Sequence, residues 1–154
     1  RKIYNLEIII TRMFTYINPR RNNLFQSAFA KQILNIKNKK NKILKHGNLK
    51  SIRSFLSLND AMSAYWIVAS KGKVGETYNI GGTKAFKVGD VLNKLIDISG
   101  VQVIKKVDKK LIRIRDVTLQ LPNIKKFVKD TGWKQNETLD YSLKSLLQEL
   151  SMKD

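Results

Sequence analysis

The chain has 154 residues, of which 42% are hydrophobic and 27% charged, and its net charge is +18. This length and composition are typical of one globular domain with a core. Cysteine is absent and His46 is the only histidine, which excludes disulfides and zinc-thiolate sites and leaves little material for a Ser-His-Asp triad. The longest apolar run is too short to span a bilayer, and no secretory signal is visible. We therefore expect a cytoplasmic protein with no metal site and no membrane partner.

The positive charge is mostly lysine, mixed with asparagine and isoleucine, as in "NIKNKKNKILKHGNLK" (35–50). A balance this basic makes a polyanion partner a hypothesis to weigh, and a basic nucleic-acid-binding module is one alternative. However, nucleic-acid surfaces usually add arginines and stacking aromatics, and no aromatic residue occurs between Phe29 and Phe55. A solvated helix end and loop is the favoured interpretation of this stretch, and nucleic acid is not the expected partner.

The first predicted element is a strand over 5–14, "NLEIIITRMF". Its nearly continuous, β-branched apolar pattern is typical of a strand buried on both faces of a parallel sheet. Asn18 and Pro19 then break the chain, and a helix is predicted from Asn22 or Asn23 to Lys39. Its inward positions, at helical spacing, are Phe25, Ala28, Phe29, Ile33 and Ile36.

Two short strands follow, at 42–47 and 53–58, and then a helix capped by Ser57 or Asn59. This helix is predicted to carry Met62, Tyr65, Trp66 and Ala69 on one side, as core rather than as site, and to end before Gly72.

The remaining elements alternate. A strand is predicted at 76–82, a helix over 87–99 ending at Gly100, and a half-exposed strand at 101–107. A short helix begins near Pro122 and ends at Gly132, and Thr138 caps a last helix that buries several leucines. This order predicts an α/β fold. A two-sided strand at the start, with few strands to flank it, and a first residue other than methionine suggest a C-terminal portion whose first half is absent.

The motifs "ITRMFTYINPRR", "FAKQI", "GNLKSIRSFLSLNDAMSAYW", "GETYNIGG" and "RIRDVTLQLPNIKKFVKDTGWK" occur in this order. Together they resemble the C-terminal half of extended short-chain dehydrogenase/reductases, the NAD-dependent epimerase/dehydratase family, and most closely GDP-mannose 4,6-dehydratase and its sister reductase. The resemblance implies a Rossmann-type fold with a small substrate-binding cap. Residues 1–21 would be the last strands of the dinucleotide-binding sheet with the following loop, and residues 22–154 mainly the sugar-nucleotide cap.

The family's glycine-rich loop and catalytic Tyr-x-x-x-Lys are missing from this sequence. The resemblance therefore implies no catalytic residue here, and NADP or NAD binding only together with the missing half. We expect the chain alone to be inactive. The "PRR" motif is kept and its second arginine, Arg21, is implied as a cofactor contact. Tyr16 stands where the family has a histidine near the nicotinamide, and is implied as a second contact.

Five residues are implied as contacts to a nucleotide sugar, with GDP-mannose as the expected substrate. Arg53 and Arg113 fall on arginines that hold the pyrophosphate, and Asp116 on an acidic residue that contacts a ribose hydroxyl. Gln26 and Ser27 fall in a segment that lies along the guanine nucleotide. From the residues alone, Arg53 could instead be a surface salt bridge, and Arg113 could pair with Asp116 at a solvated turn.

The implied activity is the NADP-dependent dehydration of GDP-mannose to GDP-4-keto-6-deoxy-mannose. The reductase that acts on this product, or another NDP-sugar epimerase or dehydratase, is an alternative, since these enzymes share the cap. The intact enzyme is expected to be a homo-oligomer.

Overall fold

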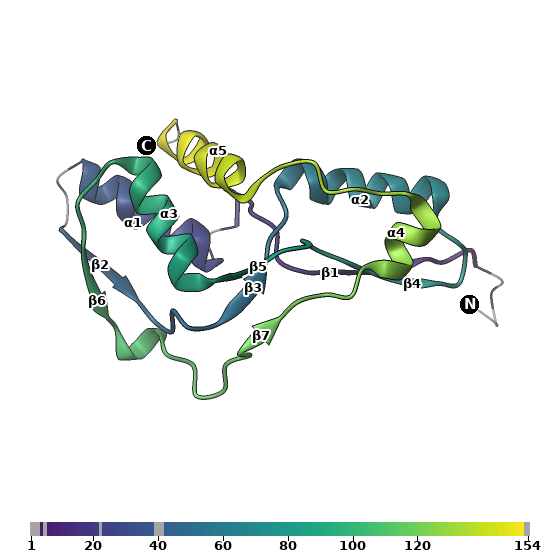
Figure 1. Ribbon diagram of the computed structural model, residues 1–154, viewed down its shortest axis with the longest axis horizontal. Helices are drawn as coiled ribbons and strands as arrows, with labels where there is room; N and C mark the ends of the chain where they lie inside the picture. The colour runs from purple at the N-terminus through teal and green to yellow at the C-terminus, as the bar shows by residue number, and fades with distance from the viewer. Residues whose placement is uncertain (1–3, 5, 22, 39–41, 153–154) are drawn as a thin grey trace.

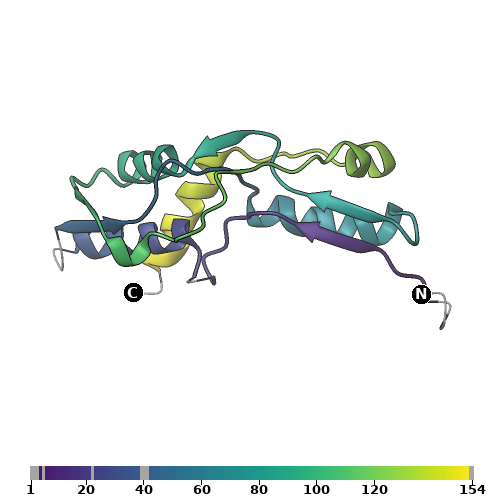
Figure 2. The same ribbon diagram turned by 90° about the horizontal axis from the view of Figure 1, so that it is seen from below.

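The computed structural model describes residues 4, 6–21, 23–38 and 42–152, and the molecule is elongated (Figures 1 and 2). The predicted element ends at Asn5, Asn22 and Lys39 lie outside these residues. At one end are β1 (Ile10–Met13), α2 (Leu58–Lys71), β4 (Thr77–Ile80) and α4 (Lys125–Thr131). At the other end are α1 (Phe25–Lys37), β2 (Ile43–His46), α3 (Val88–Ser99), β6 (Ile104–Val107) and α5 (Leu139–Ser151). The 3₁₀ turn η1 (Lys109–Leu111) follows β6 at this second end, and between the two ends lie β3 (Ile52–Ser54), β5 (Ala85–Lys87) and β7 (Leu119–Gln120).

The predicted α/β class is confirmed, and β1 pairs in parallel with β4. The expectation that β1 is buried on both faces is wrong. Ile9 and Met13 pack into the cluster under α2, but Ile8 and Ile10 on the opposite face are 39% and 53% exposed. The reason is that a strand presents alternate residues to its two faces, and α2 covers only one of them.

The predicted inner face of α2 is also wrong. Met62, Tyr65 and Trp66 are exposed, Trp66 to 78%, whereas the buried residues include Ala61 and Ala64. Small side chains allow a helix to lie close against its neighbours, and here they form the packed stripe in place of the larger residues. Ser57 is the N-cap, since its hydroxyl accepts from the Asp60 N–H.

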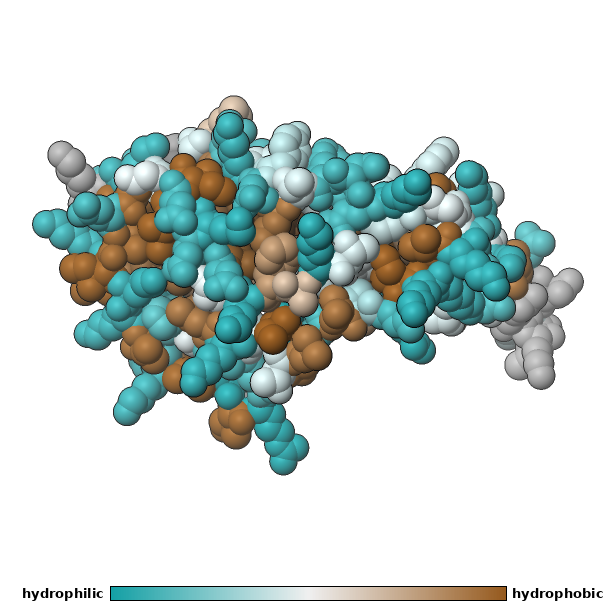
Figure 3. All heavy atoms as spheres, in the orientation of Figure 1, coloured by the Kyte–Doolittle hydropathy of each residue, from teal (hydrophilic) through white to brown (hydrophobic). Residues whose placement is uncertain are grey.

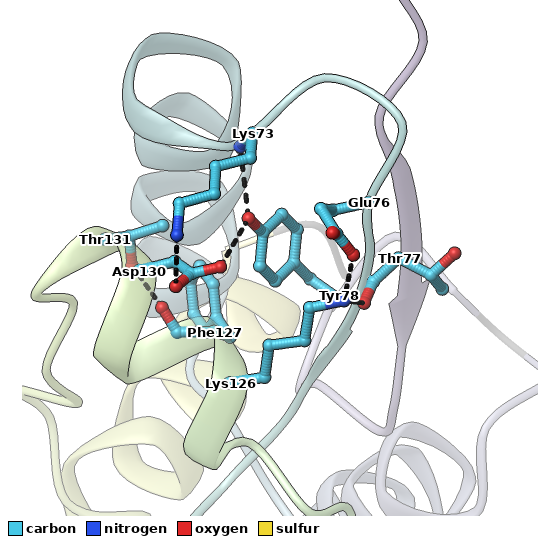
Figure 4. A network of polar contacts seen from close by, with 8 residues as sticks. All are labelled: Lys73, Glu76, Thr77, Tyr78, Lys126, Phe127, Asp130 and Thr131. Atoms are coloured by element: carbon cyan, nitrogen blue, oxygen red, sulfur yellow. Dashed lines mark hydrogen bonds and ion pairs between the residues drawn. The ribbon is translucent and has the colours of Figure 1, made fainter.

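A polar network holds α4 against β4 (Figure 4). The fully buried Tyr78 donates its hydroxyl to Asp130 Oδ2 at 3.0 Å and accepts from the Lys73 N–H. Lys73 Nζ reaches Asp130 Oδ1 at 3.1 Å, and Lys126, also paired with Glu76, lies over the Tyr78 ring. These contacts join the turn before β4, the strand itself and α4.

The other end is built around α1, α3 and α5, which enclose one apolar cluster. Its fully buried members from the three helices include Ile33, Leu92, Leu95 and Leu143. The predicted helices over 87–99 and after Thr138 are confirmed, with Gly100 in the left-handed conformation at φ +66° and Thr138 as a side-chain cap. Helix α1 begins later than predicted, after Leu24.

Strand β2 pairs in parallel with β6, and its second edge is closed by a side chain. Gln32 of α1 accepts from the Lys45 N–H through Oε1 and donates to the Lys45 carbonyl through Nε2. The third sheet has the order β5-β3-β7, with β3 antiparallel to β5 and parallel to β7. This sheet places Arg53 at the centre of the molecule. In the described part of the chain, no helix combines the length and apolar character that crossing a bilayer requires.

Candidate functional site

Arg53 and Asp116 meet at the middle of the molecule, although 63 residues separate them in sequence. Arg53 lies on β3, the central strand of its sheet, and Asp116 on the loop that leads into β7. Arg53 Nη2 is 3.3 Å from Asp116 Oδ1, and the two side chains are 13% and 21% exposed. Arg53 Nη1 also donates to the carbonyl of its neighbour Ile52 at 2.8 Å. The guanidinium is therefore held in one place.

Two further side chains fix the carboxylate. Ser51 donates its hydroxyl to Asp116 Oδ2, and Asn48 Nδ2 donates to the same oxygen at 2.9 Å. The Ser51 hydrogen bond is the largest cause that lowers the pKa of Asp116, and Asn48 and the Arg53 charge act in the same direction, while partial burial opposes them. Asp116 is therefore an anion at neutral pH and orients Arg53.

Arg113 lies three residues before Asp116 on the same loop and is exposed. Neither a hydrogen bond nor an ion pair engages its side chain among the described residues. The open alternative that Arg113 pairs with Asp116 is wrong, because the Asp116 carboxylate contacts Arg53, Ser51 and Asn48. The Arg113 side chain therefore takes no part in the Arg53–Asp116 pair.

Gln26 and Ser27 support the chain around them. Both are fully buried in the first turn of α1. Gln26 Nε2 donates to the Tyr16 carbonyl at 3.3 Å, and Ser27 donates to the Asn18 carbonyl at 3.1 Å. They fix the segment that follows β1. The Gln26 Oε1 atom is buried and has no partner among the described residues.

The two residues implied as cofactor contacts lie in the segment after β1. Tyr16 is half-buried and forms a parallel bridge with Leu56, and Arg21 is exposed on the loop before α1. A dinucleotide also needs a glycine-rich loop at the start of a helix for its pyrophosphate, and this sequence offers none between a strand and a helix. Tyr16 and Arg21 therefore do not make a dinucleotide site by themselves.

Sequence reasoning missed Asn48 and Ser51, the two partners of Asp116. Ser51 directly precedes β3 and lies two residues before Arg53, so a strand predicted to begin at Ser51 rather than at Arg53 would have placed the two on one face. Asn48 carried no such signal because its contact depends on a loop 68 residues later. Among the described residues, no group of three His, Cys, Asp or Glu side chains is placed to hold a metal ion.

Comparisons with known proteins agree on one family. The family model described as GDP-mannose 4,6 dehydratase matches residues 1–146. GDP-6-deoxy-D-mannose reductase from Pseudomonas aeruginosa is 28% identical over 143 residues, which are 91% of this chain and 47% of that protein. dTDP-D-glucose 4,6-dehydratase from Dictyostelium discoideum is 32% identical over 98 residues, 64% of this chain and 22% of that protein.

Comparison of the structure with solved structures finds the same kind of enzyme. The solved structure of RMD from Pseudomonas aeruginosa, complexed with NADPH, superimposes with a TM-score of 0.91 at 24% identity, over 99% of this chain and 50% of that one. The architecture is therefore that of Rossmann-type extended short-chain dehydrogenase/reductases, as expected. The chain spans about half or less of the length of these relatives.

Proposed function

This chain belongs to the GDP-mannose 4,6-dehydratase family, and on that premise we propose that it is the nucleotide-sugar-binding portion of an NDP-sugar 4,6-dehydratase that acts on GDP-mannose. Arg53 and Arg113 bind the diphosphate, and Asp116 orients Arg53 and accepts from a ribose hydroxyl. The observation that carries the proposal is the Arg53–Asp116 ion pair, whose side chains are only 13% and 21% exposed. A guanidinium held by a fixed carboxylate is pre-organised to meet a second anion.

In the proposed reaction the sugar is oxidised at C4, water is lost across C5 and C6, and the hydride returns to C6. A bound nicotinamide cofactor, bordered by Tyr16 and Arg21, would supply that hydride chemistry. The residues of this chain supply binding and orientation: the arginines fix the diphosphate, and Gln26 and Ser27 fix the segment on which Tyr16 lies. Localisation in the cytoplasm and assembly into a homo-oligomer are parts of the same proposal.

Calorimetric titration of GDP-mannose tests whether Arg53 binds the diphosphate. In this chain, or in a longer protein that contains it, Arg53→Ala should raise the dissociation constant by about 30-fold, roughly 2 kcal/mol, the scale of a lost charge-assisted contact. Arg53→Lys keeps a positive charge beside Asp116 but loses the two-pronged guanidinium. Its dissociation constant should lie between those of the parent chain and Arg53→Ala. Arg115→Ala is the control, since Arg115 is exposed on the same loop. Equal affinities for Arg53→Ala and Arg115→Ala would remove the proposed role.

A second candidate function is reduction or epimerisation of a related nucleotide sugar. The observation that favours it is the likeness to a GDP-6-deoxy-D-mannose reductase over 91% of this chain. Titration of GDP-mannose, UDP-glucose and dTDP-glucose under one set of conditions separates the bases. Product analysis after a longer protein that contains this chain is incubated with substrate and cofactor then separates dehydratase from reductase and epimerase.

A further inference from the structure

One cavity of this molecule shares no residue with the Arg53–Asp116 pair. It encloses about 390 Å³ between the β4–β5 loop, β5, α3 and the start of α5. Volumes of this order are typical of sites for small molecules. The cavity is lined by Phe55, Thr83, Lys84, Phe86, Lys94 and residues 135–140.

The wall formed by residues 135–137 is held rigidly. Asp60, only 2% exposed, accepts the main-chain N–H groups of Asn136 and Glu137 with its two carboxylate oxygens, each at 3.0 Å. The Gln135 amide accepts from the N–H and the hydroxyl of Thr83 and donates to the Phe55 carbonyl. These bonds fix both sides of the cavity, so binding there would require little ordering of the protein.

The lining combines an apolar side with a polar rim of both charges. Phe55, Phe86 and Leu139 supply the apolar side. On the rim, Lys94 Nζ lies 2.6 Å from Asp140 Oδ1, and the two side chains are 37% and 63% exposed. Lys84 and Glu137 add one further charge of each sign. An anion would meet two carboxylates and a cation two ammonium groups, so the charges favour a neutral ligand.

We propose that this cavity binds a neutral pyranose sugar as a site separate from the nucleotide-sugar site. A pyranose ring has an apolar face of C–H groups, which suits Phe86 and Leu139, and hydroxyls that both donate and accept. The oxygen of Asp140 that does not face Lys94 accepts a hydroxyl, the Asn136 amide donates and accepts, and Lys84 donates. The proposal does not depend on the proposed function, because it requires neither a nucleotide nor a diphosphate.

Saturation-transfer difference NMR with methyl α-D-mannopyranoside as the probe tests the proposal, and the method tolerates self-association. The sugar should receive saturation from the chain with a dissociation constant of about 1 mM, the affinity expected for so small a ligand. Asp140→Asn and Asn136→Ala should each weaken binding about fivefold, since each removes one polar partner. Lys144→Ala, on α5 but outside the cavity, is the matched control and should bind as the parent chain does.

Several outcomes would overturn the proposal. The sugar can be tested at a concentration 50-fold above the expected dissociation constant of ~1 mM. If it receives no saturation there, the cavity is not a sugar site. Equal loss in Lys144→Ala, or no loss in Asp140→Asn and Asn136→Ala, would place binding elsewhere. Competition by guanosine or inorganic phosphate would assign the signal to a nucleotide or anion site. Loss of GDP-mannose binding in Arg53→Ala with the sugar signal intact would leave both proposals standing independently.

Discussion

Each end of the molecule contains a two-stranded parallel sheet, but the outer edges of the two sheets differ. At the helical end, the Gln32 side chain closes the second edge of β2, and β6 carries Lys105 and Lys106 along its free edge. At the other end, where β1 pairs with β4, the Ile10 N–H donates to the carbonyl of Glu76, just before β4, and the Phe14 N–H donates to the carbonyl of Ile80. Because successive N–H groups of a strand point to opposite sides, those of Thr11 and Met13 face an edge where the described chain places no strand.

The two apolar clusters differ in the elements that enclose them. Figure 3 shows apolar side chains reaching the surface at both ends of the molecule. At the helical end the three helices bury Leu92, Leu95 and Leu143 completely. At the β1 end, Ile10 and Trp66 stay exposed although they lie on a strand and a helix of the packed layer. Three helices cover the first cluster, whereas an α/β layer covered on one face leaves its other face exposed.

Removing the aromatic centre of the β1 end should give the largest effect on stability. Phe127 of α4 is fully buried between Tyr78 and Trp133, with ring centroids 6.1 and 5.2 Å away. Phe127→Ala should lower the free energy of unfolding by about 3–5 kcal/mol, as expected for loss of a buried ring with its cavity. Urea denaturation measures the change.

The control for Phe127→Ala is Val128→Ala, on the same helix at a position 36% exposed, which should cost less than about 1 kcal/mol. Hydrogen exchange of the Phe127→Ala variant sharpens the comparison of the two ends. Protection should fall in β4 and α4 while the amides of α1, α3 and α5 keep theirs. Equal loss at both ends would show that the two clusters unfold as one unit.

A smaller effect is expected from the network in Figure 4. Tyr78→Phe removes one buried hydroxyl that bonds to Asp130 and Lys73, and should cost about 1 kcal/mol at pH 7. Tyr65→Phe is the matched control, since Tyr65 is 38% exposed on α2 and no hydrogen bond engages its hydroxyl among the described residues. Equal stabilities for the two variants would contradict the importance of the network.

The pH dependence of the Tyr78→Phe penalty has a definite sign. The Lys73 ammonium first, and then the Tyr78 hydroxyl, lower the pKa of Asp130 below its ordinary 3.8. A carboxyl with a lowered pKa in the folded protein contributes stability above its unfolded pKa and loses it as the pH falls through the folded value. The penalty of Tyr78→Phe should therefore shrink below about pH 3.8. A penalty that grows on acidification would contradict this assignment.

The elements that sequence reasoning found have local signals. The helix α5 begins at a Thr138 cap and repeats leucine at helical spacing, and α3 ends at Gly100, where φ is positive. Strands β5 and β7 were missed because they have three and two residues and exist only by pairing with β3. The inner face of α2 was predicted wrongly because the large apolar side chains, such as Trp66, were expected to face the core. The structure instead buries the small residues Ala61 and Ala64, which let α2 lie close to its neighbours.

The candidate site was predictable to the extent that motif order places Arg53 and Asp116. Their pairing was not, because nothing in the local sequence brings a β3 residue to a loop 63 positions later. Gln26 and Ser27 were expected to face a nucleotide, and the structure shows both buried with their donors on main-chain carbonyls. Burial of a polar side chain in a helix's first turn depends on what packs above it, and this is tertiary information.

The last prediction concerns the open edge of β1, where the effect is on association rather than on folding. An exposed, apolar strand edge pairs readily with another chain, and a lysine on such a strand prevents it. The parent chain should self-associate at high concentration, and Ile10→Lys should reduce its hydrodynamic radius in dynamic light scattering toward that of a monomer. Ile104→Lys, at a position 63% exposed on β6, is the matched control and should change little, because lysines already follow it there. A monodisperse monomer in the parent chain, or an equal effect of both substitutions, would show that the two edges do not differ as the structure indicates.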